Sequence, residues 1–328
     1  MSILSETPKA PKRDFPGEDI LVVQKLRKKY EDFYAVDGIS FSVHRGSLFA
    51  FLGQNGAGKS TTINIICSIL RKDSGKIYVD GLDLDRHSYL IKREIGIVFQ
   101  NSVLDKELSP RENLTIRAGF YNIRGEVWKE RLKKLVEMLE LSSFLDRPVG
   151  KLSGGQKRRV DIARAMVHEP KILILDEPTT GLDPQTRISV WNLINELREK
   201  TGMTVFLTTH YMEEAEKATD VVIMDKGRII AQGTPTELKN RYSGDYVILH
   251  SPNDERLEQL LKESGLSYRY NEDGQCYLLL VSSAKEAIDF LKNNEEHIHD
   301  FEVKKGDMDD VFLNITGQKR LEKEKETL

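Results

Sequence analysis

The sequence contains few cysteines and no long apolar run. Its 328 residues include two cysteines, Cys67 and Cys276, which lie far apart in the chain. We therefore expect no disulfide framework. No apolar stretch approaches the roughly 18–20 residues needed to cross a bilayer, and residues 1–19 lack the apolar core of a signal peptide. These absences predict a cytoplasmic protein.

An excess of positive charge is also missing, because the formal net charge is -3. A protein that binds nucleic acid through a broad basic surface carries the opposite excess, so the charge argues against that class and we expect no nucleic-acid partner. The hydrophobic content of 39% and charged content of 31% are typical of a soluble globular protein. The length predicts two domains.

The order of expected helices and strands divides the chain. Residues 19–242 alternate strands and helices, and an all-helical insert at about 101–169 interrupts them, which predicts an α/β domain. The segment 243–316 has the order β-α-β-β-α-β of a small ferredoxin-like α+β domain. We expect residues 1–18 to be a flexible lead and residues 317–328 a charged, frayed tail.

A glycine-rich loop, GQNGAGKST, fits the pattern G-x-x-x-x-G-K-[ST] between an apolar strand and an apolar helix. Its glycines let backbone N–H groups curl around phosphate oxygens. Lys59 can reach the β- and γ-phosphates, and the Ser60 hydroxyl is placed to bind Mg²⁺. A chance match has odds of roughly one in a hundred, so nucleotide binding is favoured. The expected binding residues are Gly53, Gln54, Asn55, Gly56, Ala57, Gly58, Lys59, Ser60 and Thr61.

A second apolar run, KILILDEP, is typical of a buried parallel strand that delivers Asp176 and Glu177 to its carboxyl end. We expect Asp176 to hold Mg²⁺ and Glu177 to act as general base on the attacking water. A strand that ends in Asp-Glu is common and often only marks where the strand meets solvent. Because the glycine-rich loop is also present, the interpretation of Asp176 and Glu177 as functional residues is favoured.

Three side-chain types offer further candidates. Gln100 follows an expected strand and could reach the metal or the attacking water, while His210 follows another and could contact the γ-phosphate. A lone histidine is more often structural. Tyr30 could stack on a purine base, with Phe33 and Tyr34 as rivals and ordinary core packing as the alternative for all three.

A second glycine pair lies in KLSGGQKRR, where Ser153, Gly154, Gly155 and Gln156 open an expected helix. Free N–H groups at a helix N-terminus suit an anion. However, nothing beside this segment completes a phosphate loop. The basic run Lys157–Arg159 is predicted to be a solvated helix face with no role in nucleic-acid binding.

These segments together resemble the ATP-binding cassette ATPases, the motor subunits of transporters, from Tyr30 to about Gly233. The glycine-rich loop corresponds to Walker A, and KILILDEP contains Walker B. Gln100 matches the Q-loop, residues 152–156 the family signature, and Asp183 of GLD the D-loop. His210 matches the switch histidine. Gln54 stands where proline is frequent in the family, a departure from which we expect little consequence.

The resemblance implies a P-loop cassette that binds ATP and Mg²⁺ and hydrolyses ATP. It implies Ser60, Gln100 and Asp176 as metal-binding residues, and Glu177, His210 and Gln100 as catalytic residues. It further implies that two cassettes dock head to tail. Ser153, Gly154, Gly155 and Gln156 of one would then cap the γ-phosphate on the other, which is either a second copy or a sister subunit.

Two short segments, LTTHYMEEAE and DDVFLNITG, resemble the drug-resistance exporter branch, whose cassettes pair with a separate ABC-2-type membrane permease. This implies a peripheral position on the inner face of the cell membrane, with the segment 101–114 as a contact surface. The small terminal domain would support dimerisation or regulation, with passive packing as the alternative.

Two other functions remain open at this point. One is a soluble cassette ATPase that acts on ribosomes or DNA, which the single cassette and the short insert disfavour. The other is a nucleotide-gated regulator with little turnover, against which the presence of both Glu177 and His210 argues. The transported substrate and the direction of transport do not follow from the sequence.

Overall fold

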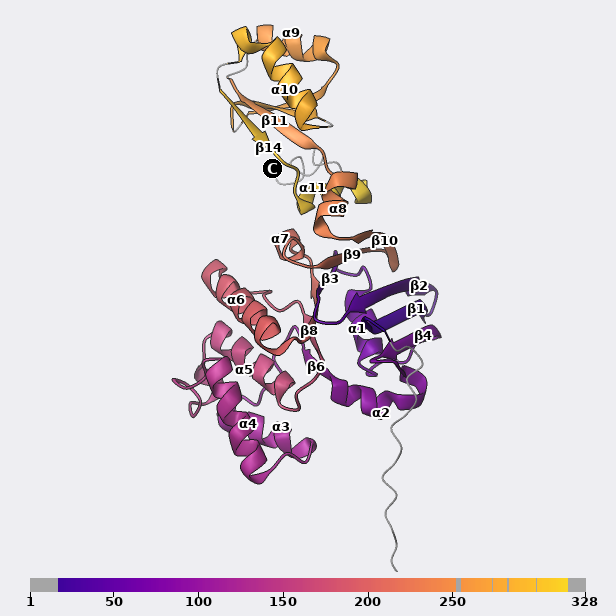
Figure 1. The fold of residues 1–328 in the computed structure, drawn as a ribbon, viewed down its shortest axis with the longest axis vertical. Coiled ribbons are helices and arrows are strands. Elements are labelled where there is room, and N and C mark those ends of the chain that lie inside the picture. Colours follow the sequence, from indigo (N-terminus) through magenta and orange to yellow (C-terminus); the bar gives the residue numbers. More distant parts are fainter. Residues whose placement is uncertain (1–16, 252–254, 273, 282, 299, 318–328) are drawn as a thin grey trace, which may run out of the picture. The chain divides into compact units, whose positions relative to one another are not determined.

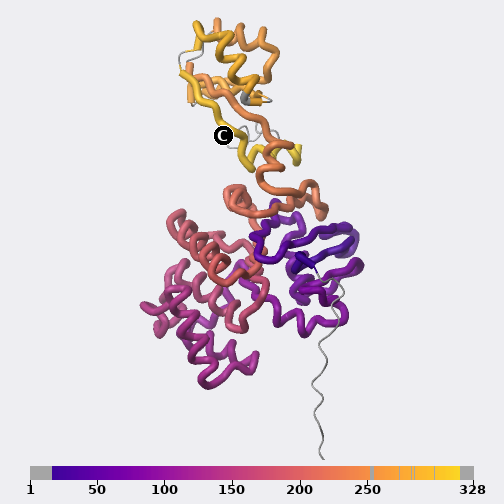
Figure 2. The backbone as a smooth tube through the Cα atoms, viewed as in Figure 1, coloured from indigo at the N-terminus to yellow at the C-terminus, as the bar shows by residue number. Residues whose placement is uncertain are grey.

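The computed structural model describes residues 17–251, 255–272, 274–281, 283–298 and 300–317. The chain divides into two compact units, Met1–Gln232 and Gly233–Leu328, whose backbones Figures 1 and 2 trace by residue number. Most of the expected lead 1–18 and tail 317–328 lies outside the described residues.

The first unit is built on a six-stranded sheet with the order β10-β9-β3-β8-β7-β6. Neighbouring strands from β9 through β6 in this order run parallel, so their carboxyl ends meet at one edge. Every residue of β3, β7 and β8 is buried, as expected for strands covered on both faces. The strands are β3 (Leu48–Gly53), β6 (Ile95–Val98), β7 (Ile172–Asp176), β8 (Thr204–Thr209), β9 (Asp220–Asp225) and β10 (Arg228–Gly233).

A second, antiparallel sheet has the order β2-β1-β4-β5. The two sheets share a hydrophobic core, in which the Phe41 ring lies 5.5 Å from Phe49, 5.2 Å from Phe51 and 6.2 Å from Phe206 between centroids. The strands are β1 (Asp19–Tyr30), β2 (Phe33–His44), β4 (Ser74–Val79) and β5 (Leu82–Asp83).

Helix α1 (Lys59–Ile66) is shorter than the apolar run that predicts it. It ends at Ile66 with Cys67 as its C-cap, and Ser68 then takes a left-handed φ of 56°. Cys67 is nevertheless a buried, free thiol, and burial raises its pKa to about 12.

Three helices with no strand between them form the insert, as expected: α3 (Pro110–Phe120), α4 (Gly125–Met138) and α5 (Gly154–Met166). Leu132 and Leu135 of α4 are buried on one face of the helix, together with Leu139, which follows it. Ser109 and Glu112 form a capping box that starts α3. Figure 1 shows these helices on one side of the central strands and β1, β2 and β4 on the other. The remaining helices of this unit are α2 (Leu84–Glu94), the 3₁₀ turn Val149–Lys151, α6 (Pro184–Thr201) and α7 (Met212–Ala215).

The second unit contains the expected β-α-β-β-α-β order. Its sheet has the order β12-β13-β11-β14 with antiparallel neighbours, which is the ferredoxin-like arrangement. The elements are β11 (Asp245–His250), α9 (Glu255–Ser264), β12 (Ser267–Asn271), β13 (Cys276–Val281), α10 (Ala284–Asn293), the 3₁₀ turn Glu295–His297 and β14 (Phe301–Lys304). Val247, Leu249, Tyr277 and Leu279 form its core with the helices.

The boundary between the units lies after Gln232, ten residues before the predicted boundary at 242/243. Helix α8 (Pro235–Tyr242) packs against α11 (Met308–Thr316), and the Asn314 side-chain amide donates to the Tyr242 carbonyl at 2.9 Å. The structure therefore assigns α8 to the second unit.

Candidate active site

The glycine-rich loop joins the buried strand β3 to the N-terminus of α1. Gly58 precedes the helix at a φ of 104°, and a Cβ there would collide with the Ala35 carbonyl oxygen. A Cβ on Gly53 would lie 2.6 Å from the Met224 carbonyl oxygen. Glycine is therefore required at both positions for the loop to reach the helix N-terminus, which is a natural site for phosphate.

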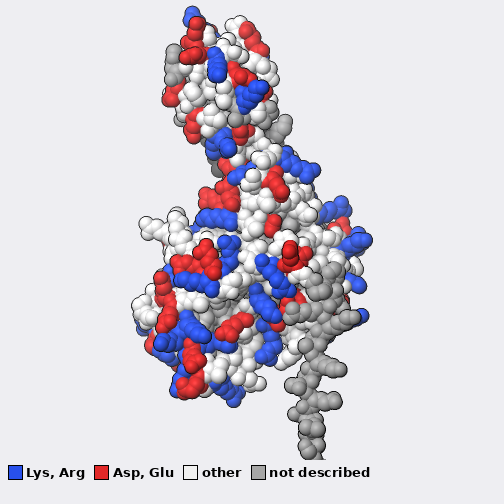
Figure 3. Space-filling model, viewed as in Figure 1, with Lys and Arg blue, Asp and Glu red and all other residues white. Residues whose placement is uncertain are grey.

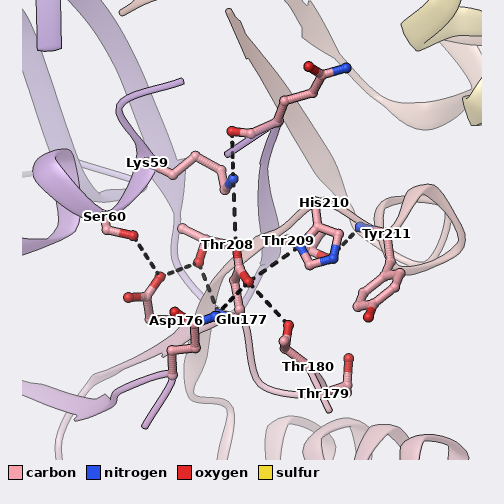
Figure 4. Close-up of polar contacts among 12 residues, drawn as sticks. Lys59, Ser60, Asp176, Glu177, Thr179, Thr180, Thr208, Thr209, His210 and Tyr211 are labelled. Carbon is pink, nitrogen blue, oxygen red and sulfur yellow. Dashed lines mark hydrogen bonds and ion pairs between the residues drawn. The ribbon is translucent and has the colours of Figure 1, made fainter. Parts of the chain in front are cut away.

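Lys59 is the first residue of α1, and its side chain folds back over the loop. Its Nζ donates to the carbonyl oxygens of Gly53 at 2.6 Å and Gln54 at 3.1 Å, and lies 3.6 Å from Glu177 Oε1 (Figure 4). Burial lowers the pKa of Lys59, while the neighbouring carboxylates of Glu177 and Asp176 oppose that shift. The ammonium is thus positioned where bound phosphates would pair with it.

Asp176 ends β7, and two hydroxyls meet its carboxylate. Oδ1 accepts from Thr208 Oγ1 at 2.6 Å and from Ser60 Oγ at 3.5 Å. Burial raises the pKa of Asp176 against the Thr208 hydrogen bond, and the adjacent Glu177 charge adds to the rise. A hydroxyl, a carboxylate and phosphate oxygens are the ligands that Mg²⁺ prefers, and a cation would relieve the repulsion between the two acids. These residues fit Mg²⁺.

Glu177 lies where three strands deliver polar side chains. Its Oε2 accepts from Gln100 Nε2 at 3.2 Å, and His210 Nδ1 lies 3.3 Å from the same oxygen. Thr180 Oγ1 also donates to it at 3.1 Å. The predicted catalytic residues Gln100, Glu177 and His210 therefore meet at one buried carboxylate, an arrangement able to accept a proton from a water placed there.

The backbone of Glu177 is in the left-handed region, with a φ of 46°. Such a conformation costs on the order of 1–3 kcal/mol in a non-glycine residue. The Glu177 N–H donates to Thr208 Oγ1 at 3.1 Å and to its carbonyl oxygen at 3.2 Å, which holds the turn in place. Thr208, which the sequence did not single out, thus positions both acids.

Arg158 corrects the prediction of a solvated basic face on α5. Its side chain is only 6% exposed, and its guanidinium donates to the carbonyl oxygens of Phe99 at 2.8 Å, Gln100 at 3.3 Å and Glu177 at 3.3 Å. Arg158 therefore joins the Q-loop to the Walker B turn. A run of three basic residues does not by itself reveal which of them points inward.

The next residue, Arg159, is also engaged by the protein. It donates to the Glu140 carboxylate at 2.6 Å and to Ser189 Oγ at 2.9 Å, and its side chain is 17% exposed. These contacts join α5 to the end of α4 and to α6, so the prediction of a solvated face is wrong for Arg159 as well.

Glu214 is a second residue that sequence reasoning missed. It is 2% exposed, and its Oε1 accepts from Trp191 Nε1 at 3.0 Å and from Thr179 Oγ1. Its Oε2 has no hydrogen-bond partner among the described residues. Since Glu214 follows His210 in the chain and Thr179 follows Glu177, this contact joins the turn after β8 to the turn after β7. In the pair Glu213-Glu214, nothing in the sequence indicates which acid is buried.

The signature segment forms the N-terminus of α5. Ser153 Oγ accepts from the Gln156 N–H at 3.3 Å, and Gln156 Oε1 accepts from the Ser153 N–H at 3.1 Å, which completes a capping box. A Cβ on Gly155 would lie 2.6 Å from the Thr186 methyl, so glycine permits the close approach of α6. Ser153 itself is exposed.

Asp183 caps α6 beside the signature. Its carboxylate accepts from the Thr186 N–H at 2.9 Å and from Thr186 Oγ1 at 2.6 Å, and these hydrogen bonds lower its pKa. Thr186 therefore contacts both the D-loop residue and the signature glycine, so the two segments share one surface.

The three aromatic candidates lie around the turn between β1 and β2. Tyr30 is 46% exposed, Tyr34 45% and Phe33 58%, so the alternative of core packing is wrong for all of them. Lys28 Nζ lies 5.4 Å from the centre of the Tyr30 ring. All three rings are thus partly exposed to solvent, and stacking on a base by Tyr30 stays a prediction.

A phosphate loop beside a strand that delivers Asp-Glu, together with a helical insert whose last helix begins at LSGGQ, defines a nucleotide-binding cassette. Comparison with known proteins agrees. Residues 36–180 match the ABC transporter family, and residues 233–316 match the C-terminal domain of DrrA1-3-like ATP-binding proteins. The chain belongs to the ATP-binding proteins of the ABC transporter family and is an ATPase subunit of that class.

Relatives share almost the full length of this chain. A Nod factor export ATP-binding protein I of Ralstonia nicotianae is 35% identical over 91% of this chain and 94% of its own. The daunorubicin resistance ATP-binding protein DrrA3 of Streptomyces coeruleorubidus is 34% identical over 94% and 99%. Both matches extend through the second unit.

Solved structures resemble the cassette. CbiO1 of Clostridium perfringens, part of the ABC transporter complex cbiONQ, superposes with a TM-score of 0.63 at 34% identity, over 69% of this chain and 93% of that one. The dimeric post-hydrolysis cassette MJ0796 bound to ADP and phosphate gives a TM-score of 0.59 at 29% identity, over 65% and 98%. Within the described residues, none of the helices has the length and apolar character to span a bilayer.

Proposed function

We propose that this chain powers an exporter, working with a separate ABC-2-type permease on the inner face of the cell membrane. Support comes from the relatives, which are named for Nod factor export and daunorubicin resistance, and from the match of residues 233–316 to the DrrA-like terminal domain. The transported molecule is set by the permease.

The observation that carries the catalytic proposal is the convergence of Gln100, His210 and Lys59 on the buried carboxylate of Glu177. ATP lies on residues 53–61 with its base against Tyr30. Glu177 accepts the proton of the attacking water, and His210 and Gln100 orient the γ-phosphate and that water.

Ser60, Asp176 and Gln100 hold Mg²⁺ in this proposal. When bound, the ion neutralises charge on the β- and γ-phosphate oxygens. The close approach of Ser60 Oγ and Asp176 supports this assignment.

The signature acts in trans, from a second copy of the chain. Ser153, Gly154, Gly155 and Gln156 lie at an exposed helix N-terminus, where N–H groups and the helix dipole favour an anion. Two chains docked head to tail thus complete two sites. The D-loop residue Asp183, which shares Thr186 with the signature, lies at the same interface.

The contact surface for the permease is the segment 101–114 with the exposed side of α3. Val103, in the loop before α3, is 49% exposed, and Ile116 and Phe120 of α3 are 53% and 78% exposed, so the insert presents large apolar side chains to solvent here. Val103 lies three residues after Gln100, so this surface borders the catalytic turn.

Co-expression with the permease tests this proposal. Phe120→Glu should reduce recovery of the chain with membranes at least tenfold and leave the ATPase rate of the purified chain within twofold. Ile288→Glu, which alters an exposed apolar residue of the second unit, is the matched control and should leave both unchanged. Membrane recovery unaffected by Phe120→Glu and Val103→Glu together would contradict the proposed contact.

A further inference from the structure

A cavity of about 460 Å³ lies at the edge of the central sheet opposite the catalytic residues. Gly46 precedes β3, Lys171 precedes β7 and Thr204 begins β8, and all three line it. Asp176 and Glu177, in contrast, follow the carboxyl end of β7. Because these strands are parallel, their amino ends share one edge, so the cavity is separate from the nucleotide site.

The interior of this cavity is apolar and adaptable. Helix α4, the end of α5, the loop before β7 and the loop before β8 contribute the apolar side chains Leu135, Met138, Met166, Pro170 and Met203. Methionine side chains are flexible and polarizable, so they accommodate apolar ligands of varied shape. A volume of this size lies within the range of about 300–1,000 Å³ typical of small-molecule sites.

The charged residues of the lining are four cations and one acid. Arg45 and Lys171 contact the buried Asp80 carboxylate at 2.5 and 2.7 Å, and Arg131 contacts Glu169, the acid of the lining, at 2.6 Å. Lys171 also contacts the Glu94 carboxylate at 3.0 Å, so three carboxylates of the protein pair with these three cations.

The fourth cation, Lys134, is exposed on α4. Among the residues that the structure describes, no carboxylate lies within ion-pair distance of it. The lining therefore combines a hydrophobic interior with one uncommitted positive charge.

We propose that this cavity binds a small single-chain amphiphile with one negative charge, its anionic head at Lys134 and its apolar chain against the methionines. One uncommitted cation matches a monoanion, whereas a neutral or cationic amphiphile leaves Lys134 unpaired. Since α4 of the insert and β8 of the core line the same cavity, the ligand links these two parts of the cassette.

Calorimetry with decanoate below its micelle concentration tests the site. The wild-type chain should bind decanoate, and Lys134→Glu should weaken binding at least tenfold by reversing the uncommitted charge. Lys133→Glu is the matched control, because Lys133 is the adjacent exposed lysine and does not line the cavity. It should bind within twofold of wild type.

Two further probes keep the proposal falsifiable. Met138→Trp should fill the cavity and also weaken decanoate binding at least tenfold, with an unchanged thermal unfolding midpoint as the check on folding. Decyltrimethylammonium should bind at least tenfold more weakly than decanoate. Absence of decanoate binding, equal losses in the two lysine variants, or equal binding of the cationic amphiphile would overturn the proposal.

The ligand could be free or part of a membrane, and vesicles distinguish these sources. If flotation with vesicles containing a single-chain phosphodiester lipid, which carries one negative charge, depends on Lys134 but not on Lys133, the ligand is presented by the membrane. If decanoate binding depends on Lys134 and flotation does not, the ligand is a soluble amphiphile. Either result supports the cavity as the binding site.

Discussion

The loop that carries Lys59 and the loop that carries Ser153 both precede a helix, but they differ in burial and in what their side chains contact. Lys59, Asp176 and Glu177 are each less than 10% exposed and are held by contacts from several strands. Ser153 and Gln156 cap their own helix at the surface. Figure 3 shows both signs of charge interspersed over the visible surface of the cassette.

This difference indicates a division of labour. Burying Asp176 and Glu177 side by side is unfavourable unless partners compensate them, and a single chain supplies these partners in Lys59, Thr208 and Gln100. The signature keeps its helix dipole open to solvent, which suits a surface that docks on another molecule's phosphate. The predictions below test each side of this comparison.

Replacing Glu177, the proposed base, should have the largest effect. Glu177→Gln keeps the size of the side chain but removes its ability to accept a proton, so we expect ATP hydrolysis to fall about 10²–10⁴-fold. ATP affinity should stay within a few fold, and an ATP-bound dimer should accumulate in size-exclusion chromatography. Unchanged turnover would remove Glu177 as the base.

A change in the exposed signature segment should reduce ATP hydrolysis without weakening ATP binding to the monomer. Ser153→Arg places a large side chain at the α5 N-terminus, and we expect a loss of about 10²–10³-fold in hydrolysis, comparable to removal of a transition-state donor. Equilibrium ATP binding to the monomer should change less than twofold. A matching loss of ATP affinity in the monomer would show that the signature acts within its own chain.

Replacing Arg158, which donates to three backbone carbonyls around the Glu177 site, should lower the free energy of unfolding. Arg158→Met leaves the carbonyls of Phe99, Gln100 and Glu177 without their donor, and we expect the free energy of unfolding to fall by roughly 2–4 kcal/mol. Lys157→Met, on the less buried neighbour, should change it by less than about 0.5 kcal/mol. Urea denaturation of the two variants measures the difference in the free energy of unfolding. Equal losses in the two variants would contradict a special structural role for Arg158.

The smallest effect should come from the contact between the two catalytic turns. Glu214→Ala removes the acceptor of Thr179 and Trp191, so we expect kcat to fall about tenfold with KM nearly unchanged, as His210 loses its support. Glu213→Ala, at the exposed neighbour, should match wild type. A change in KM alone would assign Glu214 to nucleotide affinity instead.

The sequence predicts those parts of the fold and site that depend on the spacing of residues within one short segment. The glycine-rich loop, the Asp-Glu strand end, the helical insert and the ferredoxin-like order all follow from local pattern. The roles of Arg158 and Glu214 could not be predicted, because in a run of like charges only tertiary packing decides which residue is buried. The cavity at Lys134 is assembled from separate parts of the chain, and the boundary at Gln232 depends on the packing of α8 against the distant α11.

Mixing two inactive variants tests the account most directly. Glu177→Gln retains a normal signature, and Ser153→Arg retains a normal catalytic carboxylate, so a mixed head-to-tail dimer contains one intact site and one doubly altered site. With two affinity tags to isolate the mixed dimers, we predict that these dimers hydrolyse ATP at about half of the wild-type rate per dimer, since one of their two sites is intact. Mixed dimers that form but hydrolyse no more ATP than either variant alone would contradict a site shared between two chains.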